Sequence, residues 1–350
     1  MDVKNGNAKD GVERPAPSPQ EQMVGVLAGL WVARSVSAAA KLRLADQVGD
    51  GAAKSVEELA AATKTHAPSL YRLMRGLAGA GFFAEEPGKR FRNTPLSDVL
   101  RTGAAGTMRA AADSIMGGSH WRAWGDLEHA VRTGGIAFDH AHGTDCWSFF
   151  AQHDEEQRTF NAAMTDFTKL FNPAIVKGFD FSRAGTLADI GGGHGALLMS
   201  VLQENPSVRG ILFDQPRVVE GAAGPLKDAG LAGRCQLVGG NFFESVPAAD
   251  TYMMKMILHD WNDERSGVIL RNVHRASKPG ARLLVMDSVV PASNAEPSLA
   301  RLMDLNMLVM TGGKERTEAE FRELFERAGF NLVKVHATES PVTIVEGVRR

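Results

Sequence analysis

A histidine and two acidic residues stand at comparable places in the second half of the chain. His259 follows the apolar run "MMKMIL", Asp287 lies near the end of "ARLLVMDSVV", and Glu315 lies within "GGKERT". An imidazole, whose unperturbed pKa is about 6.5, can accept a proton at neutral pH, and nearby carboxylates can orient it and stabilise its cation. A single histidine at the end of a strand is more often structural. Together with two acids, His259 predicts a site for proton transfer.

The segment "ADIGGGHGALL" is the strongest local motif. Gly191, Gly193 and Ala196 fit the pattern G-x-G-x-x-A, and Gly195 completes a tighter G-x-G-x-G with the first two. Such glycines let a ligand approach the backbone of the turn. Asp214 lies 23 residues after Gly191, where its carboxylate can accept hydrogen bonds from ribose hydroxyls. These features predict a nucleoside-containing ligand without choosing between NAD and S-adenosylmethionine; the structural alternative is a tight turn that binds nothing.

Alternating strands and helices are predicted from about residue 185 onward. The predicted strands are "TLADI", "GILFD", "CQLVGG", "DTYMMKMIL" and "ARLLVMDSVV". Helices are predicted at about 195–204, from "GILFD" to about 230, and over "DERSGVILRNVHRAS" with Asn262 as N-cap. This order predicts an α/β fold with a doubly wound parallel sheet. The sheet is expected to end in an antiparallel pair of strands formed by "FNLVKVHATESPVTIVEGV". Because the carboxyl ends of the strands line one crevice, His259 and Asp287 should face the same pocket.

The first 110 residues are predicted to be mainly helical. Ser55 and Glu58 form a capping box at the start of "SVEELAAAT", and "APSLYRLMRGLAGAGFF" has one apolar helix face. "FFAEEPGKRFRNTP" predicts two short strands around a Pro-Gly turn. Helix, helix and small hairpin is the order of a winged helix, and Arg72 and Arg75 on the second helix raise the alternative of DNA binding. Residues 1–100 carry 13 basic and 11 acidic residues, a balance of +2 that favours packing or dimerisation over DNA binding.

The composition is that of an ordinary globular protein. The 350 residues are enough for two domains, and the net charge of −2 implies no bulk attraction to nucleic acid or to an anionic membrane. The two cysteines, Cys146 and Cys235, are too few for a disulfide framework and match no metal-ligand spacing, which fits a reducing, cytoplasmic setting. The apolar run at residues 23–33 is too short to cross a bilayer and is expected as a buried helix at a subunit interface.

Four regions of different character are expected along the chain. Residues 1–20 are polar and contain three prolines, which is typical of a disordered leader. Residues 21–110 are expected to form the helical, winged-helix-like domain, and residues 181–350 the catalytic domain. Residues 111–180 are helical in pattern and rich in aromatic residues, so we expect them to bridge the two domains and to line a cleft.

Several segments together resemble one enzyme family. "LADIGGGHGALL", "ILFDQPRVV", "GGNFFESVPAADTYMMKMILHDWND" and "GGKERTEAEFRELFERAGF" are similar to the plant and bacterial small-molecule O-methyltransferases of the caffeate and polyketide type. The likeness runs from about residue 25 to residue 348. It implies a Rossmann-like, class I methyltransferase domain and a dimerisation domain, in a cytoplasmic homodimer of secondary metabolism. The implied cofactor is S-adenosylmethionine, which becomes S-adenosylhomocysteine, and no metal, nucleic acid or membrane is implied.

The resemblance also implies roles for individual residues. His259 would be the base that deprotonates a phenolic hydroxyl of a natural-product-like acceptor, flanked by Asp287 and Glu315. Many relatives have Glu at position 287, so the shorter Asp287 is expected to lie farther from the imidazole. The implied cofactor-binding residues are Thr168, Asp189, Gly191, Gly193, Asp214, Asn241, Phe242 and Lys255. The implied acceptor-pocket residues are Phe160, Met164, Met303, Asn306, Met307 and Met310, although a methionine stripe at helical spacing is equally typical of a core.

Other reactions compete with this interpretation. N- or C-methylation is the nearest alternative, and a relative that keeps the cofactor but performs hydroxylation or pericyclic catalysis is another. The presence of His259, Asp287 and Glu315 together argues against the second. A dehydrogenase is disfavoured because the motifs of the second half have no role in hydride transfer.

Overall fold

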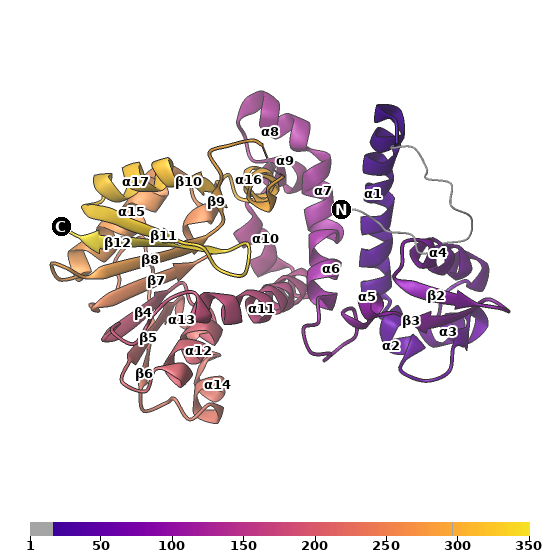
Figure 1. Ribbon diagram of the computed structural model, residues 1–350, viewed down its shortest axis with the longest axis horizontal. Coiled ribbons are helices and arrows are strands. Elements are labelled where there is room, and N and C mark those ends of the chain that lie inside the picture. The colour runs from indigo at the N-terminus through magenta and orange to yellow at the C-terminus, as the bar shows by residue number, and fades with distance from the viewer. Residues whose placement is uncertain (1–16, 296) are drawn as a thin grey trace. The chain divides into compact units, whose positions relative to one another are not determined.

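The computed structural model describes residues 17–295 and 297–350, so the predicted disordered leader at 1–20 lies mainly outside the described residues (Figure 1). The chain divides into two compact units, Met1–Thr102 and Gly103–Arg350. The described part of the first unit consists of one long helix, several short helices and a small sheet, and the second unit contains the large sheet.

The first unit has the winged-helix order that the sequence predicts. Its helices are α1 (Pro19–Lys41), α2 (Leu44–Val48), α3 (Val56–Thr63), α4 (Ala67–Gly79) and α5 (Pro95–Asp98). The strands β1 (Lys54–Ser55), β2 (Phe83–Glu86) and β3 (Arg90–Asn93) form an antiparallel sheet in the order β1-β3-β2. The capping box of Ser55 and Glu58 begins α3, and Leu70, Met74 and Leu77 form the buried face of α4, as predicted.

Helix α1 differs from the buried helix expected at residues 23–33. It extends over 23 residues and is longer than the apolar run that was expected to be too short for a bilayer. By length and composition it could cross a membrane, a test that core helices of soluble proteins and signal sequences also pass. The side chains of Met23, Val26 and Trp31 are 58%, 73% and 71% exposed. The helix is therefore not buried within its own chain, and its burial at a subunit interface stays a prediction. An exposed apolar face of this kind is typical of an interaction surface.

The second unit begins with helices that precede the sheet in sequence. They are α6 (Arg109–Ile115), α7 (Gly118–Gly125), α8 (Leu127–Thr133), α9 (Ala137–His142), α10 (Cys146–Gln152) and the long α11 (Asp154–Lys177). Phe138 and Phe150 from this region are buried together with Val309 and Met310 of α16 (Leu299–Met310). Helix α16, which comes late in the sequence, therefore packs against helices from the middle of the chain.

The large sheet has seven strands in the order β11-β12-β8-β7-β4-β5-β6. These are β4 (Thr186–Ile190), β5 (Arg209–Asp214), β6 (Cys235–Gly239), β7 (Thr251–Lys255), β8 (Arg282–Asp287), β11 (Phe330–His336) and β12 (Thr343–Arg349). β12 is antiparallel to both of its neighbours, and the other neighbouring strands are parallel. The predicted doubly wound sheet with an antiparallel end is confirmed.

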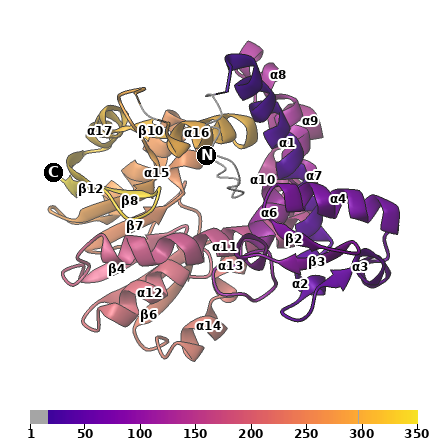
Figure 2. The same ribbon diagram turned by 45° about the vertical axis from the view of Figure 1, so that its right-hand side comes forward.

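Helices cover both faces of this sheet (Figures 1 and 2). Residues of α11, α12 (Ala196–Glu204), α13 (Pro216–Glu220) and α14 (Ala223–Asp228) share one apolar core with the strands, and residues of α15 (Asp263–Ala276) and α17 (Glu318–Arg327) share the other. Asn262 caps α15 as predicted. The single helix expected between "GILFD" and residue 230 is instead two, because Gly221 ends α13 and α14 begins at Ala223.

Candidate active site

His259 lies on a short turn beyond the end of β7. The strand stops at Lys255, Met256 takes a φ of 55°, and His259 is the middle residue of the 3₁₀ turn η1 (Leu258–Asp260). The sequence predicted a strand that continued through Leu258. It ends earlier because the left-handed backbone at Met256 turns the chain, and non-glycine residues hold such a conformation mainly where their surroundings impose it.

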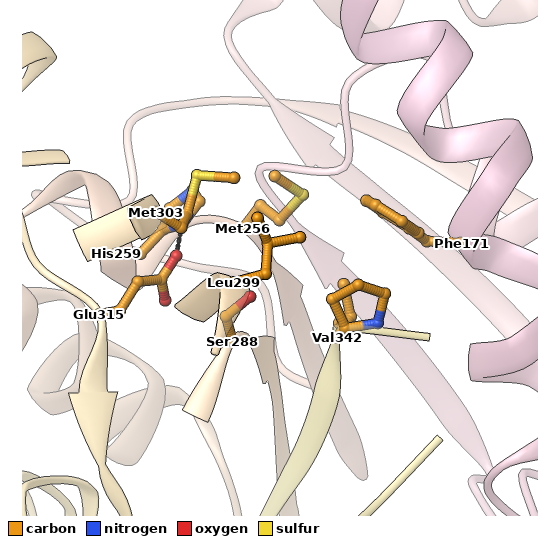
Figure 3. Close-up of a pocket in the computed structure, with 9 residues that line it drawn as sticks. Phe171, Met256, His259, Ser288, Leu299, Met303, Glu315 and Val342 are labelled. Atoms are coloured by element: carbon orange, nitrogen blue, oxygen red, sulfur yellow. Dashed lines mark hydrogen bonds and ion pairs between the residues drawn. The ribbon is translucent and has the colours of Figure 1, made fainter. Parts of the chain in front are cut away.

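The imidazole of His259 is held by a carboxyl group from a distant segment. Oε1 of Glu315 lies 2.8 Å from Nδ1 of His259, and both side chains are almost fully buried (Figure 3). Because a carboxylate oxygen only accepts, this bond assigns a proton to Nδ1. Nε2 has no hydrogen bond within the described chain, and its nearest charged neighbour is Oδ1 of Asp260 at 3.8 Å.

The surroundings of His259 favour its cationic form. Burial by itself would lower the pKa of the imidazole. The charge of Asp260, the hydrogen bond that His259 donates to Glu315 and the charge of Asp287 outweigh this effect and raise the pKa of His259 to about 10. A ring with this pKa is a stronger base than free histidine, and it carries a proton at neutral pH before an acceptor arrives.

Asp287 is close to the cluster without holding the ring. It is fully buried, and within the described residues neither of its carboxyl oxygens has a hydrogen-bond partner. Burial raises the pKa of Asp287, and the charge of His259 opposes that effect. Glu315, not Asp287, therefore orients the imidazole in this structure.

A small cavity of about 20 Å³ adjoins His259 and Glu315, with space for a water-sized molecule (Figure 3). Its lining consists of Phe171, Met256, His259, Ser288, Leu299, Met303, Glu315, Pro341 and Val342. Most of these residues are apolar, and sequence reasoning had selected only three of them. An aromatic acceptor needs more room than this. Met256 and Met303 can provide it, since unbranched thioether side chains repack easily.

The residues expected in the acceptor pocket divide between this cavity and the core. Met303 lines the cavity. Phe160 stacks on Phe150 at a centroid distance of 4.7 Å, and Met164 packs beside the buried alanines of α6. Met307 and Met310 are buried, and Met310 belongs to the apolar cluster between α16 and the preceding helices.

Asn306 has a fixed orientation that the sequence did not reveal. Its Oδ1 accepts hydrogen bonds from Nε2 of His120 at 2.8 Å and from Nε1 of Trp124 at 3.0 Å. Its Nδ2 has one weak contact, with Sδ of Met303 at 4.0 Å. Burial lowers the pKa of His120, so this histidine is a neutral donor. The sequence did contain one indication of this pair of donors, because His120 and Trp124 are four positions apart and therefore lie on one face of α7.

The glycine loop forms an open cradle at the carboxyl end of β4. Gly191, Gly193 and Gly195 have φ values of 72°, 58° and 79°, a region that only glycine adopts easily. A Cβ on Gly191 would lie 2.5 Å from Cδ1 of Ile257, whereas beside Gly193 there is open space. The N–H of Gly193 donates to Oδ2 of Asp214 at 2.8 Å, so the loop and the acid predicted to bind ribose are joined.

The remaining predicted cofactor residues surround this loop. Lys255 donates to Oγ1 of Thr168 at 2.9 Å. Burial raises the pKa of the nearby Asp189 to about 7, against the opposing charge of Lys255. A ring atom of Phe242 lies 3.7 Å from the position of a Cβ on Gly191.

Asn241 bonds within its own turn, where its Nδ2 donates to Glu244 and its Oδ1 accepts from the N–H of Phe243, so its place near an adenine ring stays a prediction. The predicted residues provide carboxylates, a hydroxyl and an ammonium beside an open glycine loop. This donor set fits a nucleoside that carries amino and carboxyl groups. S-adenosylmethionine has this composition.

Two family models match the sequence. One, described as the O-methyltransferase domain, matches residues 124–331, and the other, the O-methyltransferase dimerisation domain, matches residues 24–103. Each model matches most of one structural unit. The resemblance seen in the motifs is confirmed.

Similar proteins of known activity and structure cover nearly the whole chain. The phenazine O-methyltransferase PhzM of Lysobacter antibioticus is 44% identical over 326 residues, which are 93% of this chain and 94% of the relative. The crystal structure of LaPhzM has a TM-score of 0.90 at 42% identity and covers 95% of this chain and 100% of its own. The O-methyltransferase NcsB1 from neocarzinostatin biosynthesis, solved with S-adenosylmethionine and 2-hydroxy-5-methyl naphthoic acid, has a TM-score of 0.81 at 33% identity and covers 93% and 98%.

Proposed function

This chain belongs to the O-methyltransferase family, and from that membership we propose that it methylates a phenolic hydroxyl of a natural-product-like acceptor with His259 as the general base. The enzyme is an S-adenosylmethionine-dependent O-methyltransferase. The observation that supports the role of His259 most directly is its hydrogen bond to Glu315 beside the cavity. This bond holds the ring and leaves Nε2 without a hydrogen bond to the described chain, so that in the neutral form of the ring Nε2 can take the proton of the acceptor.

The chemistry of the acceptor explains why a base of this strength is useful. A phenol has a pKa of about 10 and is almost entirely neutral at pH 7. His259 also has a pKa of about 10, so once the ring has lost its own proton, it takes the proton of the phenol with little change in free energy. A positioned base of this kind accelerates a reaction by about 10²- to 10⁴-fold. The carboxyl groups of Glu315 and Asp260 then stabilise the imidazolium that forms.

The glycine loop and its neighbours are proposed to bind the cofactor. When bound, S-adenosylmethionine supplies a methyl group on a positively charged sulfur. We assign the ribose hydroxyls to Asp214 and the adenine ring to the apolar face of Phe242. Asp189, Lys255 and Thr168 provide opposite charges and a hydroxyl for the amino and carboxyl groups.

The acceptor pocket and the homodimer are also proposed. Met303 and Asn306 of α16 are assigned to the acceptor pocket, in which Asn306 offers N–H groups because its oxygen is already occupied. The homodimer is assigned to the first unit, because the family describes residues 24–103 as a dimerisation domain and α1 exposes apolar side chains there. The divisions proposed near residues 110 and 180 stay proposals, and the two compact units divide between Thr102 and Gly103.

A screen of phenolic acceptors with isotope-labelled S-adenosylmethionine tests the proposed reaction. We expect label on a phenolic oxygen of at least one acceptor with the native enzyme, and little label with His259→Gln. Label on a nitrogen or a carbon of the acceptor would show that the enzyme is an N- or C-methyltransferase instead. Undiminished transfer by His259→Gln would remove His259 from the mechanism.

A further inference from the structure

We infer that Arg316 is a positioning residue for His259, which fixes the turn η1 through its main-chain carbonyls without contacting acceptor or cofactor. The inference rests on the proposed role of His259 as the base. Arg316 is completely buried and is the largest of the fully buried side chains in the described chain. A buried guanidinium is costly unless nearly all of its N–H groups have partners, so its contacts indicate what it stabilises.

The guanidinium of Arg316 binds carbonyls on both sides of His259. Nη1 donates to the carbonyl of Leu258 at 3.0 Å, and Nη2 donates to the carbonyl of Trp261 at 2.9 Å. Leu258 immediately precedes His259, and Trp261 follows the turn. The two bonds therefore span the turn that carries the imidazole.

Other contacts hold the guanidinium in place. Its Nε donates to Oδ1 of Asp263 at 2.9 Å, and Nη2 also donates to Oγ of Ser266 at 3.1 Å. Asp263 and Ser266 belong to the first turns of α15, which starts directly after the His259 turn. Strand β10 (Arg316–Thr317), the turn η1 and the start of α15 are thus joined through one side chain.

The neighbours of Arg316 act on the same turn. Glu315 binds the ring of His259, so consecutive residues contact the side chain of the base and the backbone that carries it. Gly313 lies so close that a Cβ there would be 1.9 Å from the carbonyl oxygen of His259. The segment 313–316 therefore determines where the imidazole lies relative to the cavity.

The geometry of arginine is necessary for this arrangement. A planar guanidinium presents several N–H groups in fixed directions, whereas a lysine ammonium is a flexible point charge. Lysine at position 316 would keep the positive charge and could not span both carbonyls in the same way. Arg316 does not line the cavity, so its effect must pass through the turn.

Arg316→Lys and Gly313→Ala test the inference by two different routes, since the first loosens the turn and the second pushes against it. We expect each to lower kcat by about 10²-fold, the cost of a 1 Å misplacement, with S-adenosylhomocysteine binding retained in calorimetry. Histidine ring ¹⁵N spectra of the labelled enzyme, with the His259 signal assigned by His259→Gln, should show a displaced titration in both variants.

Arg234→Lys is the matched control. Arg234 also donates to several main-chain carbonyls, those of Leu202, Asn205, Pro206 and Val208, but it lies just before β6, away from His259. We expect it to lower the unfolding temperature while the His259 titration and kcat stay unchanged. An unchanged titration in folded Arg316→Lys and Gly313→Ala, or an equal displacement in Arg234→Lys, would overturn the inference. Since the ¹⁵N titration needs no acceptor, it gives an answer even if His259 is not the base.

Discussion

Nδ1 of His259 and Oε1 of Glu315 lie 2.8 Å apart, although the two residues are 56 positions apart in the sequence. This contact selects the tautomer of the imidazole and fixes its plane. It also raises the pKa of the ring by stabilising the cation. The fold creates the contact by bringing the segment after α16 back to the carboxyl end of β7.

Replacing His259 by Gln should separate chemistry from cofactor binding. We expect kcat to fall by about 10²- to 10⁴-fold, because an amide cannot take the phenolic proton. S-adenosylhomocysteine affinity should remain, since Asp214 and the glycine loop belong to other strands. His336→Gln is a suitable control, because His336 also bonds a carboxylate, Oε2 of Glu346, but belongs to the edge pair β11–β12 and does not line the cavity. Equal losses in both variants would contradict a specific role for His259.

Glu315→Gln should move the pH dependence of the reaction. In the native enzyme His259 is mostly protonated at neutral pH, so kcat/KM should rise with pH toward the pKa of about 10. Removing the carboxylate takes away a charge that stabilises the imidazolium, and the pKa must fall. We expect the rising limb of the pH profile to shift to lower pH, together with a lower maximum because the ring is less well oriented. A limb that does not move would show that His259 does not control it.

The same variant has a predictable effect on stability. A histidine whose pKa is raised from about 6.5 to about 10 on folding contributes stability that is complete below pH 6.5 and is lost as the pH rises through 10. The loss of unfolding free energy in Glu315→Gln should therefore be largest in weakly acidic solution and smaller at alkaline pH. Urea unfolding across this pH range measures it, and a constant difference would exclude the linkage to His259.

The sequence predicted those parts that depend on local patterns or on the resemblance. The apolar runs predicted the sheet, and the capping pattern at Ser55 predicted a helix start. Arg316 and the pair His120–Asn306 were missed because their partners are far apart in the chain, 186 positions for the latter. The strand end at Lys255 was also missed, since no residue type marks the left-handed backbone of Met256. The apolar pattern predicted helix α1 correctly, but such a pattern does not identify the surface against which the helix packs.

Asp287→Asn should also weaken the loss of stability with rising pH, but by raising stability at neutral pH, whereas Glu315→Gln lowers stability in acid. Burial raises the pKa of Asp287, so its ionisation weakens the folded state as the pH increases above its ordinary value near 4. The asparagine variant does not ionise, so it does not lose stability in this way. We expect its unfolding temperature to match the native one in acid and to exceed it at neutral pH. A lower unfolding temperature of Asp287→Asn at neutral pH would show that the carboxylate is stabilising.

The exposed face of α1 should control the oligomeric state. Val26 and Trp31 are strongly exposed in the single chain, in a segment that matches the dimerisation domain. Val26→Glu with Trp31→Glu would place two charges in an apolar interface, which is costly. We expect sedimentation to show a monomer for this variant and a dimer for the native enzyme. A control with Arg72→Glu on α4 should remain a dimer, and a dimeric double variant would assign the interface elsewhere.

Asn306 should select acceptors by the group that stands beside the reacting hydroxyl. Its oxygen is occupied by His120 and Trp124, so toward the acceptor it can offer only N–H groups. It should favour acceptors with a carbonyl, carboxylate or ring nitrogen near the hydroxyl. In Asn306→Leu the loss of one neutral hydrogen bond, about 0.5–1.5 kcal/mol, should lower kcat/KM for such acceptors by about 2- to 10-fold and leave simple phenols unaffected. Asn306→Asp keeps the bonds to His120 and Trp124 but cannot donate, so it should lose the same acceptors. Equal losses for both classes of acceptor would mean that Asn306 only supports the fold of α16.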